Sequence, residues 1–156
     1  MELDIKEFDF TAPAVSKDNI FEYTYDGKGL TILVFFPGAF TDVCTKEVCD
    51  FRDSMAELND LGAEVLGISV DTPFSLDEFR EQYNLNFKLI SDTNKEIIDQ
   101  YDVRTDFMDI GYNGLAKRAV FIIRDKEILY KEIMDNPENL PDMEKLKEKL
   151  AEIQQN

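Results

Sequence analysis

The sequence predicts an α/β domain in which a mixed central β-sheet carries helices on both faces. Three short, mostly apolar runs have the length of strands buried on both faces, at 31–36, 63–70 and 119–123. Helices are expected at 43–61, 73–83 and 141–153. Strand and helix alternate in the first part of the chain and a hairpin precedes the last helix, so the sheet should be mixed.

The first strand stops at Pro37-Gly38, and a helix begins soon after it. Gly62 is expected to cap the end of this helix, whose apolar residues recur at helical spacing: Val43, Val48, Phe51, Met55, Leu58 and Leu61. The strand at 63–70 follows directly, and Pro73 suits the first turn of the next helix.

The second half of the chain begins with a short strand at 87–90 and a short helix at 94–101. The strand at 119–123 is expected to pair with residues 127–133 through a turn at 124–126. The last helix is amphipathic, and its apolar side is formed by Met143, Leu146, Leu150 and Ile153.

The apolar residues within 104–116 follow neither the helical spacing nor the alternation of a strand, so we expect an irregular segment there. The segment contains several large apolar side chains, namely Phe107, Met108, Ile110, Tyr112 and Leu115. An irregular segment this apolar is expected to pack on a site rim or on a partner subunit.

Length and charge limit the classes of function. The 156 residues suit one domain covering 1–156, without repeats or linkers. The net charge of −16, from 33 acidic and 17 basic residues, makes nucleic acid and membranes poor partners. No apolar run reaches the length of a membrane span, and the N-terminus lacks the pattern of a signal peptide. The expected compartment is the cytoplasm.

The absence of histidine excludes Ser-His-Asp and Cys-His catalysis and every site that needs an imidazole ligand. The only cysteines are Cys44 and Cys49, too few for a cysteine-only zinc or iron–sulfur site. Acid–base chemistry must therefore use carboxylates, lysine, tyrosine, cysteine or water. We expect no metal and no cofactor.

The most informative stretch joins the strand at 31–36 to the following helix, and it places Cys44 in the first turn of that helix. Ligands of open α/β sheets bind beyond the carboxyl ends of strands. Free N–H groups and the helix dipole at this position favour a thiolate, which is the nucleophilic form of cysteine. Thr41 is three residues earlier, so its hydroxyl is expected to reach the sulfur or a bound oxygen. From the residues alone, Cys44 could also be a small buried apolar residue, Thr41 an ordinary N-cap and Pro37 a strand terminator.

The pattern Pro37-x-x-x-Thr41-x-x-Cys44-x-x-Glu47 resembles the active-site signature of peroxiredoxins. Arg118, directly before a strand, matches the arginine of that family, and the resemblance extends over roughly residues 8–134. It implies a thioredoxin-like fold and a thiol-dependent peroxidase that reduces hydrogen peroxide and organic hydroperoxides without metal, haem or flavin.

The resemblance also implies a role for each signature residue. Cys44 would attack the peroxide O–O bond and become a sulfenic acid, while Thr41 would hydrogen-bond the thiolate and the peroxide oxygen. Pro37 would shield the site from water. Arg118 would stabilise the thiolate and orient the peroxide, and Glu47 would help to position the arginine. Without the family, Arg118 would be taken for a solvated surface charge.

Cys49 follows Cys44 by five residues, a spacing similar to that of the bacterioferritin-comigratory, PrxQ-like branch. There the second cysteine of the same helix resolves the sulfenic acid as a disulfide. Residues 39–41 and 51–53 also resemble the AhpE-like branch, which often uses one cysteine, and Cys49 could be a helix-face residue without a role. In an intact helix the two Cα atoms would be about 8.5 Å apart, beyond the roughly 7 Å limit for a disulfide, so bridging requires local unwinding.

A thioredoxin- or glutaredoxin-like protein is the expected reductant of such a disulfide. Two other functions are compatible with the fold. A disulfide carrier would need a C-x-x-C pair, which this sequence lacks, and a redox-responsive chaperone is suggested only by the apolar residues within 105–115. The family resemblance suggests a homodimer formed through the loops on the side of the site, and a monomer is also compatible.

Overall fold

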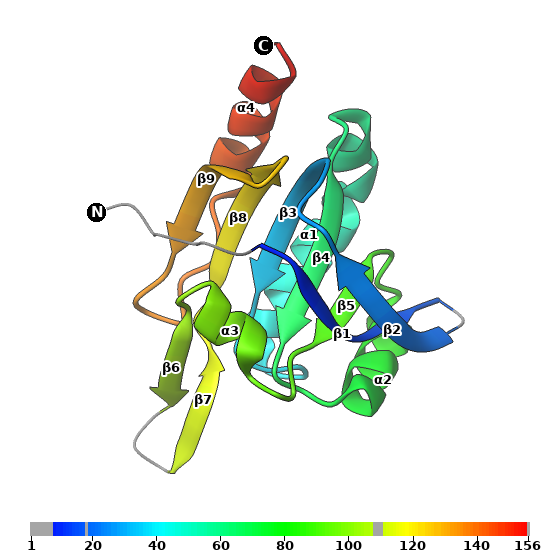
Figure 1. Cartoon of the computed structure of the whole chain (residues 1–156), viewed down its shortest axis with the longest axis vertical. Helices are drawn as coiled ribbons and strands as arrows, with labels where there is room; N and C mark the ends of the chain where they lie inside the picture. The colour runs from blue at the N-terminus through cyan, green and yellow to red at the C-terminus, as the bar shows by residue number, and fades with distance from the viewer. Residues whose placement is uncertain (1–7, 18, 108–110, 156) are drawn as a thin grey trace.

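The computed structural model describes residues 8–17, 19–107 and 111–155, and a seven-stranded mixed sheet is its main feature (Figure 1). The spatial order of the strands is β2-β1-β5-β4-β3-β8-β9. Their bounds are β1 Phe10–Ser16, β2 Asn19–Tyr25, β3 Leu30–Phe35, β4 Glu64–Ser69, β5 Lys88–Ser91, β8 Ala119–Arg124 and β9 Glu127–Ile133. β3 lies inside the sheet, parallel to β4 and antiparallel to β8, which confirms the predicted mixed sheet.

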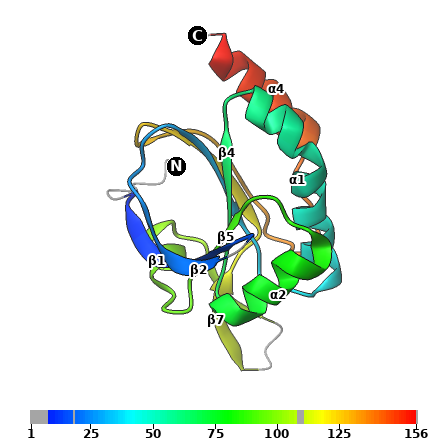
Figure 2. The ribbon, with the colours of Figure 1, turned by 90° about the vertical axis from the view of Figure 1, so that its right-hand side faces the viewer.

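Helices cover both faces of this sheet, as predicted. Their bounds are α1 Asp42–Asp60, α2 Pro73–Tyr83, α3 Glu96–Gln100 and α4 Met143–Gln154. Figure 2 shows α1, α2 and α4 on one side of the sheet. Alternate residues of β3 face the two layers: Ile32 and Val34 belong to the core under these three helices, and Leu33 and Phe35 to the core under α3.

The continuous apolar sequence of β3 follows from burial on both of its faces. The side chains of α1 that face the sheet, including Val48, Phe51 and Leu58, are fully buried. Each such side chain stabilises the packed helix by roughly 1.5–3 kcal/mol relative to an exposed position. This packing fixes the N-terminal turn of α1 beside the carboxyl end of β3.

The predicted element bounds agree with the observed ones to within two residues for every helix and for the five strands that were predicted. At the end of α1 the C-cap is Leu61, and Gly62 follows it with φ of +83°. Its N–H donates to the Asn59 carbonyl, so this glycine occupies a left-handed conformation that other residues adopt only with strain.

The expectation of an irregular segment at 104–116 is wrong, because β6 (Arg104–Phe107) and β7 (Tyr112–Ala116) form a two-stranded antiparallel sheet. A register shift between Thr105 and Asp106, together with Gly114 at φ of +76°, interrupts the two-residue period that would have indicated strands. Leu115 is buried and Tyr112 is 45% exposed, whereas Met108 and Ile110 lie outside the described residues.

The hairpin of β1 and β2 has no counterpart in the sequence prediction. β1 pairs along its length with β2 and, through Ala14 and Val15, with β5. Pro13 lies in the middle of β1, where a proline normally argues against a strand. Within the part of the chain that the structure describes, no helix is both long enough and apolar enough to cross a membrane.

Candidate active site

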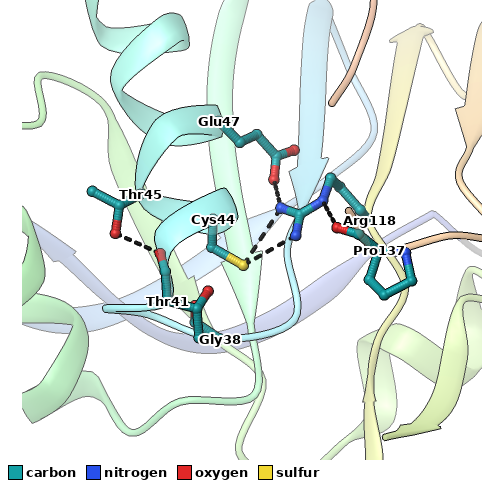
Figure 3. Close-up of polar contacts among 7 residues, drawn as sticks. All are labelled: Gly38, Thr41, Cys44, Thr45, Glu47, Arg118 and Pro137. Atoms are coloured by element: carbon teal, nitrogen blue, oxygen red, sulfur yellow. Dashed lines mark hydrogen bonds and ion pairs between the residues drawn. The ribbon is translucent and has the colours of Figure 1, made fainter. Parts of the chain in front are cut away.

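The candidate site lies where β3 ends and α1 begins (Figure 3). β3 ends at Phe35, Thr41 is the N-cap of α1, and Cys44 lies in the first turn of the helix. β8 runs antiparallel to β3 with Ala119 opposite Phe35, so Arg118 is adjacent to the carboxyl end of β3. The sheet register therefore brings Arg118 to Cys44 although 74 residues separate them.

Three predicted site residues form one buried cluster. The Arg118 Nη1 and Nη2 atoms each lie 3.4 Å from the Cys44 Sγ, to which they donate, and Nη1 also donates to the Glu47 Oε1 at 2.6 Å (Figure 3). Arg118 and Cys44 are each 2% exposed and Glu47 is 1% exposed. Arg118 is therefore not a solvated surface charge, and Cys44 is buried against a guanidinium.

The cluster contains one cationic group, the Arg118 guanidinium, and two acidic groups, the Glu47 carboxyl and the Cys44 thiol. Although burial lowers the pKa of Arg118, the charges of Glu47 and Cys44 raise it above its ordinary value, so Arg118 stays charged. Burial raises the pKa of Glu47 to about 8, and the guanidinium offsets only part of this effect. The second carboxyl oxygen of Glu47, Oε2, is buried and has no hydrogen-bond partner among the residues that the structure describes.

A backbone group outside α1 holds the other side of the guanidinium. The Arg118 Nε donates to the Pro137 carbonyl at 2.9 Å, and the Arg118 carbonyl accepts from the Met134 N–H at 2.9 Å. The contact of Pro137 could not be predicted from the sequence, because a backbone carbonyl is present in every residue and is not marked by residue type.

Thr41 lies at the predicted N-cap, but its hydroxyl does not point to the sulfur. The Thr41 Oγ1 donates to the Gly38 carbonyl at 3.0 Å, and among the described residues it has no hydrogen bond to Cys44 (Figure 3). The Thr41 carbonyl accepts from both the N–H and the hydroxyl of Thr45, at 2.9 and 2.7 Å. Pro37 is buried beside this loop.

Two contacts that the sequence analysis did not assign hold the loop before α1. The Asp71 Oδ2 accepts from the Ala39 N–H at 2.8 Å and from the Ser69 hydroxyl at 2.7 Å. Phe40 has φ of +67°, and its ring packs against that of Phe79 with centroids 5.0 Å apart. Asp71 could have been found, because it follows β4, whose carboxyl end lies beside that of β3.

Cys49 lies in α1 about two helical turns after the N-cap, and it is half-buried. Burial raises its pKa, the charge of Arg52 lowers it, and the charges of Asp53 and Asp50 raise it further. Both cysteines are free thiols, and α1 is continuous across them. The structure is therefore that of a reduced, helical state.

The described residues contain no group of three or more cysteine, aspartate or glutamate side chains placed to hold a metal ion. A groove of about 930 Å³ lies at the amino ends of β4 and β5, with Val65, Arg80 and Phe87 in its lining. It includes neither Cys44 nor Arg118, so it is separate from the thiol cluster.

Comparisons with known proteins match the chain to a family. Residues 6–131 match the model of the AhpC/TSA family. The chain is 40% identical over 106 residues to peroxiredoxin Bcp of Escherichia coli K12, which covers 66% of this chain and 68% of that protein. The structure is similar to that of Enterococcus faecalis AhpC, with a TM-score of 0.85 and 25% identity over 99% of this chain and 93% of the other. It is also similar to peroxidoxin BcpB of Mycobacterium tuberculosis, with a TM-score of 0.79 and 25% identity over 94% of each chain.

Proposed function

This chain belongs to the AhpC/TSA family and is a peroxiredoxin, a thiol-dependent peroxidase, and we propose that Cys44 is its peroxide-attacking residue. The observation that carries the proposal is the position of the Arg118 guanidinium, with Nη1 and Nη2 both 3.4 Å from the Cys44 Sγ. A buried positive charge stabilises negative charge on the sulfur, and the thiolate is the reactive form of cysteine.

In the proposed reaction the Cys44 thiolate attacks one oxygen of a hydroperoxide. An S–O bond forms, the O–O bond breaks, and the second oxygen leaves as an alcohol or water after it takes up a proton. Cys44 is oxidised by two electrons to a sulfenic acid, and the peroxide is reduced. The substrates proposed are hydrogen peroxide and organic hydroperoxides.

Arg118 is proposed to orient the peroxide as well as to stabilise the thiolate. A guanidinium has five N–H donors, and four hydrogen bonds run from Arg118 to Pro137, Glu47 and Cys44. The remaining N–H, on Nη2, has no acceptor among the described residues, and its nitrogen lies 3.4 Å from the Cys44 Sγ. A donor at this position lowers the barrier by stabilising the oxyanion that develops as the O–O bond breaks.

The other signature residues are proposed to prepare the site. Glu47 positions Arg118 through its 2.6 Å contact with Nη1. Pro37, which is buried, excludes water from the thiolate. The Thr41 hydroxyl, which donates to the Gly38 carbonyl in this state, would rotate toward the sulfur and the peroxide oxygen when substrate is bound.

We propose that Cys49 resolves the sulfenic acid. Its thiolate attacks the Cys44 sulfur, a disulfide forms, and the hydroxyl leaves as water after protonation. Because α1 is a continuous helix across both residues, its first turns must unwind for the sulfurs to meet. A thioredoxin- or glutaredoxin-like dithiol of the cytoplasm would then reduce the disulfide. In the alternative cycle, an external thiol resolves Cys44 directly.

Stopped-flow kinetics with hydrogen peroxide and an alkyl hydroperoxide test the nucleophile in the wild type, Cys44→Ser and Cys49→Ser. The reaction with the first equivalent of peroxide should be lost in Cys44→Ser and kept in Cys49→Ser. A Cys44→Ser variant that still reacts as fast as the wild type would reject the assignment of the nucleophile.

Mass spectrometry after one equivalent of peroxide tests the resolving step. We expect a Cys44–Cys49 disulfide within one chain. A Cys44 sulfenic acid that persists while Cys49 stays free would reject intramolecular resolution and support the one-cysteine cycle.

A further inference from the structure

The turn between β9 and α4 contacts the cluster from the side opposite α1. We propose that this turn, residues 134–139, sets the orientation of the Arg118 guanidinium, and that Asn136 is the positioning residue within it. The inference rests on the proposed reaction of Cys44. Its physical basis is the pair of backbone contacts described above, from the Arg118 Nε to the Pro137 carbonyl and from the Met134 N–H to the Arg118 carbonyl.

Asn136 closes the turn around Pro137. Its side-chain Oδ1 accepts from the Glu138 N–H at 3.0 Å, and its carbonyl accepts from the Asn139 N–H at 3.0 Å. The contact from the Glu138 N–H to the Asn136 Oδ1 is an Asx turn, in which an asparagine side chain takes the place of a backbone carbonyl. The proline ring fixes φ at Pro137, so the two Asn136 contacts determine where the Pro137 carbonyl points.

The bond at Nε restricts rotation of the guanidinium about the end of the Arg118 side chain. Because the guanidinium is planar, fixing Nε also fixes the directions of Nη1 and Nη2. The two Nη atoms lie at the same distance from the Cys44 Sγ, 3.4 Å, as expected when both donors face one acceptor. A shift of the Pro137 carbonyl would therefore make the Nη1–Sγ and Nη2–Sγ distances unequal.

The turn also differs from the other Arg118 partners in its place in the chain. Cys44 and Glu47 both belong to the first turns of α1, the part proposed to unwind during resolution. Pro137 lies outside α1, so its carbonyl remains as an acceptor when the other two depart. The guanidinium would then stay oriented for the return of the thiolate after reduction.

The position of Asn136 makes the idea testable without disrupting the core. Residues 135–139 are all exposed, so substitutions there remove little buried surface. The test compares Asn136→Ala, which removes the acceptor, with Asn136→Asp, which keeps it. Asn139→Ala is the matched control, because Asn139 is in the same turn and contributes only its backbone N–H to the contact with Asn136.

The readout is the second-order rate of Cys44 oxidation by hydrogen peroxide, measured by stopped flow across pH 5–9. Loosening one hydrogen bond to a charged group should slow Asn136→Ala about tenfold at neutral pH. The midpoint of its pH–rate profile should also move to higher pH, whereas Asn136→Asp and Asn139→Ala should stay within about twofold of the wild type. Urea unfolding should give the same midpoint for all four proteins.

A second variant, Pro137→Gly, frees φ of the residue that supplies the carbonyl, and its profile should move in the same direction. A wild-type rate and pH profile in both Asn136→Ala and Pro137→Gly would overturn the inference. So would equal slowing in Asn139→Ala. A wild-type protein whose Cys44 does not react with peroxide would instead overturn the proposed function, so the two failures are distinguishable.

Discussion

Substitution of Glu47 by glutamine tests how the buried charges at the site are balanced. Burial raises the pKa of Glu47 from 4.5 to about 8, although the Arg118 guanidinium at 2.6 Å lowers it. In the unfolded chain the carboxyl group is solvated and titrates near its ordinary value. Between these two values the native protein holds a proton that the unfolded chain has released.

This difference in proton binding makes the free energy of unfolding depend on pH. Because the native state binds one more proton than the unfolded state, stability falls as pH rises through this range. One pKa unit corresponds to about 1.4 kcal/mol, so the Glu47 contribution between pH 5 and pH 8 is at most about 4 kcal/mol. That is a large part of the roughly 5–15 kcal/mol that stabilises a typical domain. Glutamine cannot ionise and still offers an oxygen to Arg118, so Glu47→Gln should lose this pH dependence.

Urea unfolding of the reduced proteins at pH 5, 6, 7 and 8 measures the effect. The stability of Glu47→Gln relative to the wild type should rise with pH. Glu57→Gln is the matched control on the same helix, since Glu57 is 58% exposed and pairs with Lys147 at 2.9 Å. The free energy of unfolding of Glu57→Gln should change with pH in the same way as that of the wild type. If Glu47→Gln also follows the wild type from pH 5 to pH 8, Glu47 is ionised over this whole range, and its ion pair with Arg118 outweighs the effect of burial.

Three further predictions concern packing, backbone strain and the second thiol. A Cβ at Gly67 would lie 2.7 Å from the Leu89 Cδ2, so Gly67→Ala should lower the free energy of unfolding by about 1–3 kcal/mol in urea; an unchanged midpoint would contradict this packing. Phe40 has φ of +67°, so Phe40→Gly, which relieves the strain, should be more stable than Phe40→Ala by about 1 kcal/mol, although both lose the ring. Burial raises the pKa of Cys49 above its ordinary 9.0, so alkylation of Cys49 by iodoacetamide in Cys44→Ser should still accelerate at pH 9; a plateau at lower pH would refute this.

The strands of the central sheet were predictable because burial on both faces requires a continuous apolar run, as in β3 and β8. The hairpin of β1 and β2 was missed because Pro13 interrupts β1, and because its pairing with β5 joins residues about 75 positions apart in the sequence. The error at 104–116 has a local cause. The bulge after Thr105 and the left-handed Gly114 remove the alternation by which a half-buried strand is recognised.

Within the site, the sequence predicted which residues meet but not every contact between them. Cys44 was predictable from its place in the signature-like pattern and Arg118 from its place directly before a strand. The antiparallel register of β3 and β8 explains why they meet. The direction of the Thr41 hydroxyl could not be predicted, because it depends on a competing acceptor, the Gly38 carbonyl. The contribution of Pro137 was hidden for a different reason: it comes from the backbone.

The net charge of −16 bears on which peroxides can approach Cys44, the proposed nucleophile. At about pH 8 hydrogen peroxide and alkyl hydroperoxides are neutral, whereas peroxynitrite is largely an anion, which this field repels. Salt weakens the repulsion, because the Debye length falls from about 30 Å at 0.01 M to about 8 Å at 0.15 M. In stopped-flow measurements over this range, the rate constant for peroxynitrite should rise with salt and that for hydrogen peroxide should stay level. A peroxynitrite rate that falls with salt would mean that attraction by the Arg118 charge, rather than repulsion by the whole chain, controls the encounter.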